Sequence, residues 1–165
     1  MKKFFVLFLA SIMLNLNTTV FAKIVVPTDT EIIIAPVEKV TSNNPKSTIK
    51  ARIVEDVIID GTVIFRSGDK ASFNVADFEK SSYLGVAGNL EVYNGVVYDT
   101  KGTRHKVLVN EKFYGKNRIW VQVVSSLSLT IILFPLALFA FIHGSEAKVT
   151  PSTELNTVLQ SSFEY

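Results

Sequence analysis

The chain has 165 residues, with 17 basic and 15 acidic side chains and no cysteine. The lack of cysteine excludes disulfides, thiolate metal sites and a lipidated N-terminus. Because Lys2 and Lys3 lie in the first 22 residues, residues 23–165 carry 15 basic and 15 acidic side chains, a balance that argues against DNA or RNA as a partner.

The first 22 residues have the three regions of a secretory signal peptide. A basic start is followed by an almost uninterrupted apolar run at 4–16 and by a polar stretch that leads to Val20 and Ala22. Signal peptidase accepts small residues at these two positions, so we predict cleavage after Ala22. The apolar run is shorter than the ~20 residues that cross a bilayer, which argues against an uncleaved anchor. We therefore expect an exported protein of the periplasm or cell envelope, possessing one β-rich domain at 23–165.

Residues 24–124 read as short strands separated by turns, without a sustained helical period. Asp60-Gly61 between two apolar runs predicts a hairpin, and Asn94-Gly95 predicts a second one, because both dipeptides favour a two-residue type I′ turn. Thr100-Lys101-Gly102 predicts a third hairpin with a longer loop, and the alternation at 70–75 predicts a strand with one wet face. Turns about every ten residues indicate an all-β fold, an antiparallel sandwich or a small barrel.

Four segments between residues 50 and 110 share a pattern of strands and turns. They are residues 57–64, which contain a Gly-Thr turn, Ser67-Gly68-Asp69, the G-x-x-G-x-L-x-V strand at 85–92, and the Asp-x-x-Gly hairpin at 99–102. This series resembles a group of exported bacterial β-rich proteins of unassigned function, although Asp69 stands where those proteins have threonine. The resemblance implies an envelope-associated β domain and supplies no catalytic residue.

Residues 119–142 contain no charged side chain. The segment fits a transmembrane helix by length, with Trp120 at one interface. However, Lys116 and Arg118 on its exported flank oppose the positive-inside rule, and its β-branched residues suit buried strands bent at Pro135 or an inserted hairpin. Both interpretations leave this segment as the predicted contact with a protein partner or the membrane. The predicted contact residues are Trp120, Leu127, Leu129, Ile131, Ile132, Leu133, Phe134, Leu136, Leu138, Phe139, Phe141 and Ile142.

Side chains that carry catalysis or bind metals are scarce. Neither His105 nor His143 has a partner at metal-ligand spacing, so we predict no metal and no cofactor. His105 lies between two basic residues of a predicted strand and is expected on a solvated face. The resulting hypothesis is a non-catalytic envelope structural or interaction protein. The alternatives are a membrane-anchored subunit of a secretion or pilus assembly, and a small envelope hydrolase that uses Asp56, Asp60 or His105.

Overall fold

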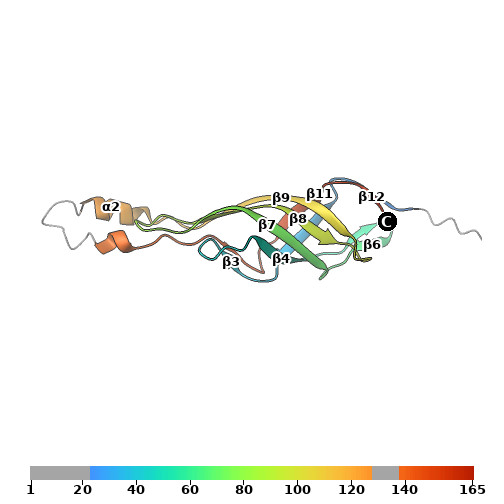
Figure 1. The fold of residues 1–165 in the computed structure, drawn as a ribbon, viewed down its shortest axis with the longest axis horizontal. Helices are drawn as coiled ribbons and strands as arrows, with labels where there is room; N and C mark the ends of the chain where they lie inside the picture. The colour runs from blue at the N-terminus through green and yellow to red at the C-terminus, as the bar shows by residue number, and fades with distance from the viewer. Residues whose placement is uncertain (1–22, 128–137) are drawn as a thin grey trace, which may run out of the picture.

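A computed structural model describes residues 23–127 and 138–165 of the chain, so the predicted signal peptide lies outside the described residues. Strands account for most of the regular secondary structure in the described residues, which confirms the predicted fold class (Figure 1). The elements in chain order are β1 (Val25–Val26), β2 (Glu31–Pro36), β3 (Val40–Thr41), β4 (Thr48–Ile53), β5 (Val57–Ile59), β6 (Thr62–Phe65), β7 (Lys70–Glu79), β8 (Asn89–Tyr98), β9 (Arg104–Tyr114), α2 (Ile119–Leu127), β10 (Lys148–Val149), β11 (Leu155–Leu159) and β12 (Phe163–Glu164).

Six of these strands form a closed antiparallel barrel in the order β11-β2-β4-β7-β8-β9. The barrel closes where β11 pairs with β9, at Val158↔Leu108 and Leu159↔Val107. Three two-stranded pairs, β1 with β12, β3 with β10 and β5 with β6, lie outside this order. Of the two predicted architectures, the sandwich and the small barrel, the structure is the barrel.

The barrel interior is filled by alternate residues of each strand. In β4, Ile49, Ala51 and Ile53 are buried, while the residues between them are exposed. Phe73 of β7 and Phe65 of β6 are fully buried in the same core. This two-residue period is the one that the sequence shows, because successive side chains of a strand point to opposite faces.

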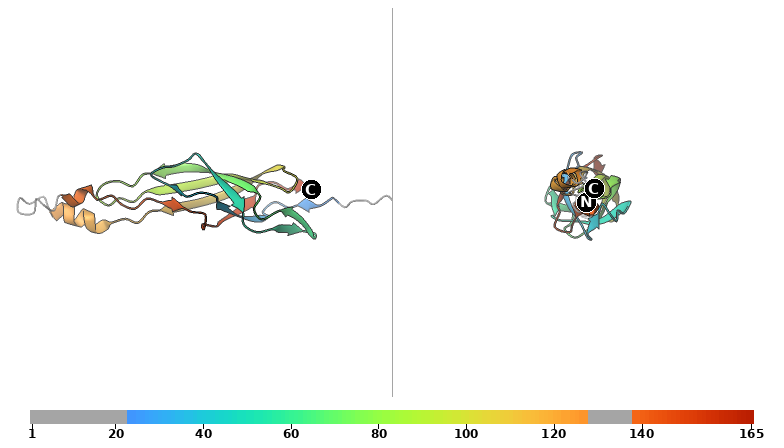
Figure 2. Two further views of the ribbon diagram at one scale, coloured as in Figure 1. Left: turned by 90° about the horizontal axis from the view of Figure 1, so that it is seen from below. Right: turned by 90° about the vertical axis from the view of Figure 1, so that its left-hand side faces the viewer.

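Three barrel strands are about twice as long as the others. β7, β8 and β9 have 10, 10 and 11 residues, whereas β2, β4 and β11 have six, six and five. The long strands run past the barrel and continue as a narrow projection along its long axis, and the C-terminus lies at the opposite end of the molecule (Figures 1 and 2). The molecule is therefore elongated, with α2 at one extremity.

Two of the three predicted hairpins are confirmed. β5 and β6 pair through Asp60 and Gly61, both of which have positive φ (50° and 75°), as the type I′ turn requires. β8 and β9 pair through the loop that contains Thr100-Lys101-Gly102, with Tyr98 opposite Arg104. The predicted strand at 70–75 is the first half of β7.

The hairpin predicted at Asn94-Gly95 is wrong, because β8 continues through this dipeptide. The register of β8 shifts here against both neighbours, β7 and β9, so the dipeptide forms a β-bulge. Asn94 still has positive φ (51°), and a Cβ on Gly95 would lie 2.8 Å from the carbonyl oxygen of Ser72. Both halves of β8 pair with the same two neighbours, and this pairing excludes a chain reversal.

The buried strands predicted within 119–142 are wrong for residues 119–127, which form α2. These residues lie at the far end of the projection, away from the six strands of the barrel, and none of those strands pairs with them (Figure 1). A helix instead satisfies its backbone groups internally, and β-branched residues disfavour a helix only mildly. Neither α2 nor any other helix in the described part of the chain has the length and hydropathy that crossing a bilayer requires.

Candidate interaction tip

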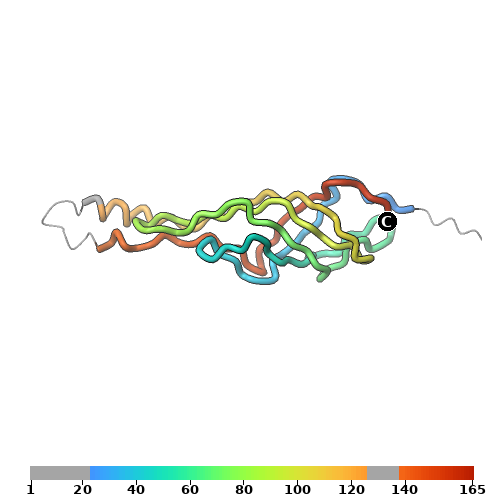
Figure 3. Tube along the Cα trace, viewed as in Figure 1, coloured from blue at the N-terminus to red at the C-terminus, as the bar shows by residue number. Residues whose placement is uncertain are grey.

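A narrow arm connects the barrel to the extremity that carries α2. We define the arm as residues 80–88, 115–118 and 142–147, three segments that run side by side (Figure 3). Their backbones are joined by hydrogen bonds, including Gly115 N to Gly88 O (2.8 Å) and Ser145 N to Lys116 O (3.2 Å). The chain therefore enters and leaves the apolar segment from the same end of the barrel.

Glycines allow the three segments of the arm to approach closely. A Cβ on Gly115 would lie 1.9 Å from the carbonyl oxygen of Ser145, and one on Gly144 would lie 2.1 Å from that of Val86. A Cβ on Gly85 would lie 2.4 Å from the carbonyl oxygen of Arg118, and one on Gly88 would lie 2.2 Å from Oγ of Ser42, which lies beside the arm. Any side chain at these positions would push the segments apart, since real Cβ atoms do not approach other atoms this closely.

The far end of the arm is a tip that has three parts. The first part is a tight turn at residues 83–86. The amide of Val86 donates to the carbonyl of Tyr83, and both central residues have positive φ, 57° at Leu84 and 73° at Gly85. Gly85 adopts this conformation freely, but Leu84 adopts it at a cost, since its Cβ is crowded there. The turn therefore holds a strained, exposed leucine at the end of the arm.

Helix α2 forms the second part of the tip and exposes apolar side chains. Val121 is fully buried, whereas Ile119 (64%), Trp120 (51%) and Val123 (54%) are exposed. The helix has no acidic residue in its first turn and no basic residue in its last turn. Its own sequence thus provides little helix stabilisation in water. Burying the exposed part of each of these side chains would contribute on the order of 1 kcal/mol.

The third part of the tip is the 3₁₀ turn at residues 138–141, near the end of the apolar segment 119–142. Leu138 (70%) and Phe141 (68%) are exposed. The turn at 83–86 docks against it, because Leu84 N donates to Ala140 O (3.0 Å) and Gly85 N donates to Ile142 O (2.9 Å). We define the tip as the far end of the arm, namely residues 83–86, α2 and residues 138–141.

Aromatic contacts hold the three parts of the tip together. The rings of Trp120 and Phe139 meet edge to face with centroids 5.8 Å apart, which joins α2 to the 3₁₀ turn. Tyr83 contacts Phe141 at 6.1 Å and His143 at 4.3 Å. The exposed apolar side chains therefore lie on a packed framework.

The structure places five of the predicted contact residues at the tip with described side chains. Trp120, Leu138 and Phe141 are exposed, and Phe139 and Ile142 are half-buried. Leu127 ends α2, but its side chain lies outside what the structure describes, as do Leu129, Ile131, Ile132, Leu133, Phe134 and Leu136. The sequence analysis did not predict Tyr83, Leu84 and Val86 as contact residues, because they are distant from residues 119–142 in the chain. The apolar side chains on both sides of Gly85 were the signal in the sequence that could have indicated them.

The opposite end of the barrel holds a buried pair of titratable side chains. Nε2 of His105 lies 3.0 Å from Oδ2 of Asp99, and their side chains are only 9% and 3% exposed. The His105 ring stacks on Phe163 of β12 at 3.7 Å and meets Phe65 edge to face at 5.7 Å. The solvated face expected for His105 is wrong, because the aromatic residues of β6 and β12 cover it.

Asp99 also organises the loop between β8 and β9. Its Oδ1 accepts hydrogen bonds from the amides of Lys101 (2.9 Å) and Thr103 (2.7 Å). The C-terminal Tyr165 lies against the same loop, since its hydroxyl contacts Thr100 Oγ1 at 2.5 Å and Nζ of Lys101 lies 3.6 Å from its ring centroid. The Asp99–His105 pair thus ties the end of the chain to the barrel.

The residues of the hydrolase alternative do not meet. Asp56 accepts a hydrogen bond from the amide of Ser67 (2.6 Å), Asp60 occupies the β5–β6 turn, and His105 contacts Asp99. Among residues 23–127 and 138–165, no contact joins these three side chains, and no group of metal-ligating side chains is found.

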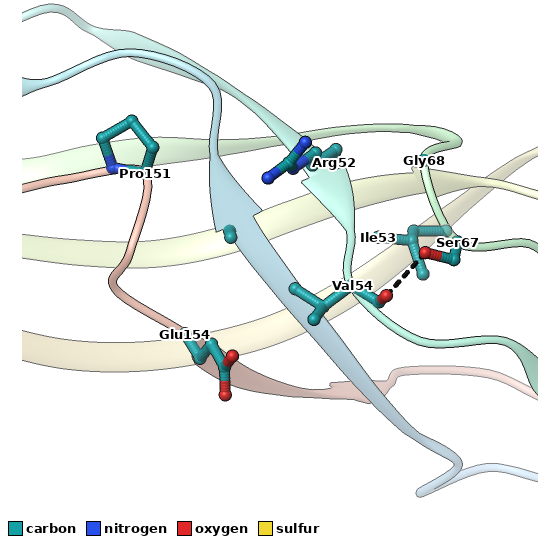
Figure 4. Close-up of a pocket in the computed structure, with 8 residues that line it drawn as sticks. Arg52, Ile53, Val54, Ser67, Gly68, Pro151 and Glu154 are labelled. Carbon is teal, nitrogen blue, oxygen red and sulfur yellow. Dashed lines mark hydrogen bonds between the residues drawn. The ribbon is translucent and has the colours of Figure 1, made fainter.

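A cleft of about 300 Å³ lies on the flank of the barrel (Figure 4). It is lined by Arg52 of β4, by Ser67, whose hydroxyl donates to Val54 O (2.6 Å), and by Glu154 before β11. Arg52 and Glu154 come from different elements and do not point toward one another (Figure 4). None of the three hydrolase candidates lines this cleft.

The comparisons with known proteins find similarity among solved structures and none by sequence. No protein-family model matches the chain, and no curated protein matches it by sequence. The chain is similar to the solved structure of ComB10 of the Com type IV secretion system of Helicobacter pylori, with 9% identity, a TM-score of 0.44, and coverage of 84% of this chain and 89% of that one. With so low an identity and TM-score, this similarity does not carry that protein's assembly over to the present chain.

Proposed function

We propose that this protein is a non-catalytic component of the cell envelope that contacts another envelope component through its tip. The observation that carries the proposal is the exposure of Ile119, Leu138 and Phe141, each more than 60% exposed, at the extremity of an elongated molecule. Large apolar side chains gathered on one surface mark a contact with a protein or a membrane.

The arm supports this role because it separates the contact surface from the barrel. Its three segments are held by backbone hydrogen bonds and by the close packing at Gly115 and Gly144. A packed arm keeps the tip at a fixed distance, whereas a loop of the same length would let the apolar side chains fold back onto the barrel. The predicted export of the chain provides the compartment in which this contact would form.

Membrane fractionation of cells that express the tagged protein tests the proposal. We expect the wild type to sediment with the envelope, and the triple variant Ile119→Ser, Leu138→Ser, Phe141→Ser to move largely to the soluble fraction. The matched control replaces three similarly exposed apolar residues of the barrel region, Val25, Val37 and Ile58, by serine.

The control should sediment like the wild type, and circular dichroism of both variants should retain the β signal. Equal sedimentation of the tip variant and the wild type would contradict the proposal. Crosslinking at Leu138 then identifies whether the contacted component is a protein.

A further inference from the structure

Charge is distributed unevenly between the barrel and the projection. Residues 80–88 and 115–147 hold three of the 15 basic side chains of residues 23–165 and one of the 15 acidic ones, Glu146, which leaves 12 basic and 14 acidic side chains elsewhere. The projection therefore carries a formal charge of +2 and the remainder −2. The balanced total conceals this separation.

The three cations lie on the arm directly behind the tip. Arg118 immediately precedes α2 and donates its amide to the carbonyl of Gly85. The carbonyl of Lys116 accepts from Ser145, and Lys80 is two residues from Ser82, which accepts the amide of Gly144. All three side chains are exposed. Together they form a collar, which we define as Lys80, Lys116 and Arg118.

The collar cations are not engaged within the molecule. None of them forms an ion pair with another described residue, in contrast to Lys112 on the adjoining strand, which lies 2.8 Å from Glu91. Glu146, the acidic residue of the arm, lies 3.9 Å from Lys39 and 3.8 Å from Lys148 and pairs with neither collar lysine nor with Arg118. The collar side chains are therefore available to an external anion.

Aromatic side chains occupy the boundary between the collar and the apolar end. Trp120 follows Arg118 by two residues and is half-exposed, while Tyr83 is exposed on the segment that contains Lys80, three residues nearer the extremity than that lysine. Tryptophan and tyrosine prefer the interface of a bilayer, where the ring meets acyl chains and the polar atom meets headgroups. The order from the extremity inward is apolar, aromatic and cationic.

From this order we infer that the tip inserts into the surface of a bilayer that contains anionic phospholipid, with the collar on the lipid phosphates. The inference rests on the proposed contact role of the tip and names the contacted component. A protein partner with an apolar socket would also accept Phe141 and Leu138, but an apolar socket alone provides no anion for the three collar cations. In a bilayer, the acyl chains would accept the apolar side chains of the tip, and anionic headgroups at the depth of the collar would pair with its cations.

Vesicle binding by the purified protein tests the inference, with Trp120 as reporter because it is the only tryptophan. Vesicles of phosphatidylglycerol should shift its emission to shorter wavelength and co-sediment with the protein. Vesicles of phosphatidylcholine should bind far more weakly, and added salt should weaken the binding to phosphatidylglycerol.

Charge removal at the collar provides the decisive comparison. Lys80→Gln, Lys116→Gln and Arg118→Gln together should weaken binding to phosphatidylglycerol by on the order of 100-fold, since each cation contributes about fivefold. The matched control neutralises three exposed barrel cations, Lys50→Gln, Lys70→Gln and Lys106→Gln, and should change binding by less than about twofold.

The possible failures are distinguishable from one another. Equal binding of the collar variant and the wild type would overturn the assignment of the collar to lipid phosphates. Absence of binding to both vesicle types, together with tip-dependent sedimentation in cells, would replace the bilayer by a protein and leave the proposed function standing. Sedimentation that does not depend on the tip would overturn the proposed function itself.

Discussion

Nε2 of His105 lies 3.0 Å from the carboxylate of Asp99, and the two residues close the loop between β8 and β9 beneath the aromatic ring of Phe163. The carboxylate is the shared acceptor for the imidazole and for two loop amides. Because β12 covers the pair, the loop and the end of the chain stabilise each other. This arrangement provides a structural role for both titratable side chains.

Replacing Asp99 by asparagine should destabilise the barrel by about 1–3 kcal/mol, because the buried acceptor of several hydrogen bonds loses its charge and one oxygen. Chemical denaturation followed by circular dichroism measures the change. Asp56→Asn is the matched control, since Asp56 is exposed and accepts one amide hydrogen bond. A loss no larger than that of the control would contradict the role assigned to Asp99.

The same pair predicts a dependence of stability on pH. Burial acts to raise the pKa of Asp99, but the hydrogen bonds from His105, Thr103 and Lys101 and the attraction of His105 together lower the pKa below its ordinary 3.8. A carboxyl whose pKa is lowered by folding stabilises the folded state above its unfolded pKa, and this contribution is lost as the pH falls through the folded pKa.

The stability difference between the wild type and Asp99→Asn should therefore be constant above about pH 5 and shrink below about pH 4. Denaturant midpoints at a series of pH values give this difference directly. A difference that grows on acidification has the wrong sign for the mechanism.

Gly115→Ala should loosen the arm without unfolding the barrel. A Cβ would lie 1.9 Å from the carbonyl oxygen of Ser145, so the two segments must separate and the hydrogen bond from Gly115 N to Gly88 O is lost. Hydrogen exchange should accelerate in residues 80–88 and 142–147 and remain unchanged in β4. Gly102→Asn is the control, because that site has open space and asparagine tolerates its positive φ. Unchanged exchange in the arm of Gly115→Ala would show that close packing there is not required.

Leu84→Asn should weaken the contact made by the tip without lowering the stability of the protein. Asparagine adopts positive φ more readily than leucine, so the variant should be as stable as the wild type or more stable by up to ~1 kcal/mol. Tip-dependent sedimentation should nevertheless decrease, because an exposed apolar side chain is lost. Leu108→Asn, at a similar exposure on β9 (46% against 43%), should leave sedimentation unchanged and gain no stability. Full sedimentation of Leu84→Asn would remove Leu84 from the contact surface.

Local sequence signals determined much of the barrel. The alternation along β7 and the Asp60-Gly61 turn depend on side-chain period and backbone preference, which are properties of a few adjacent residues. The apolar content of residues 119–142 likewise predicted Trp120, Leu138 and Phe141 as contact residues, and the structure leaves their side chains exposed. These features required no knowledge of distant neighbours.

Only the tertiary structure decided how those local signals are used. Asn94-Gly95 has the backbone preference of a turn, but pairing on both sides of β8 converts it into a bulge. His105 is surrounded by charge in the sequence, yet residues about 40 and 60 positions away, Phe65 and Phe163, bury its ring. Residues 119–127 form helix α2 and not the predicted strands, because they lie at the end of the projection, away from the barrel strands with which they would pair. The sequence by itself determined which residues are apolar, and the closed barrel with its glycine-packed arm decided that several of them face outward at one extremity.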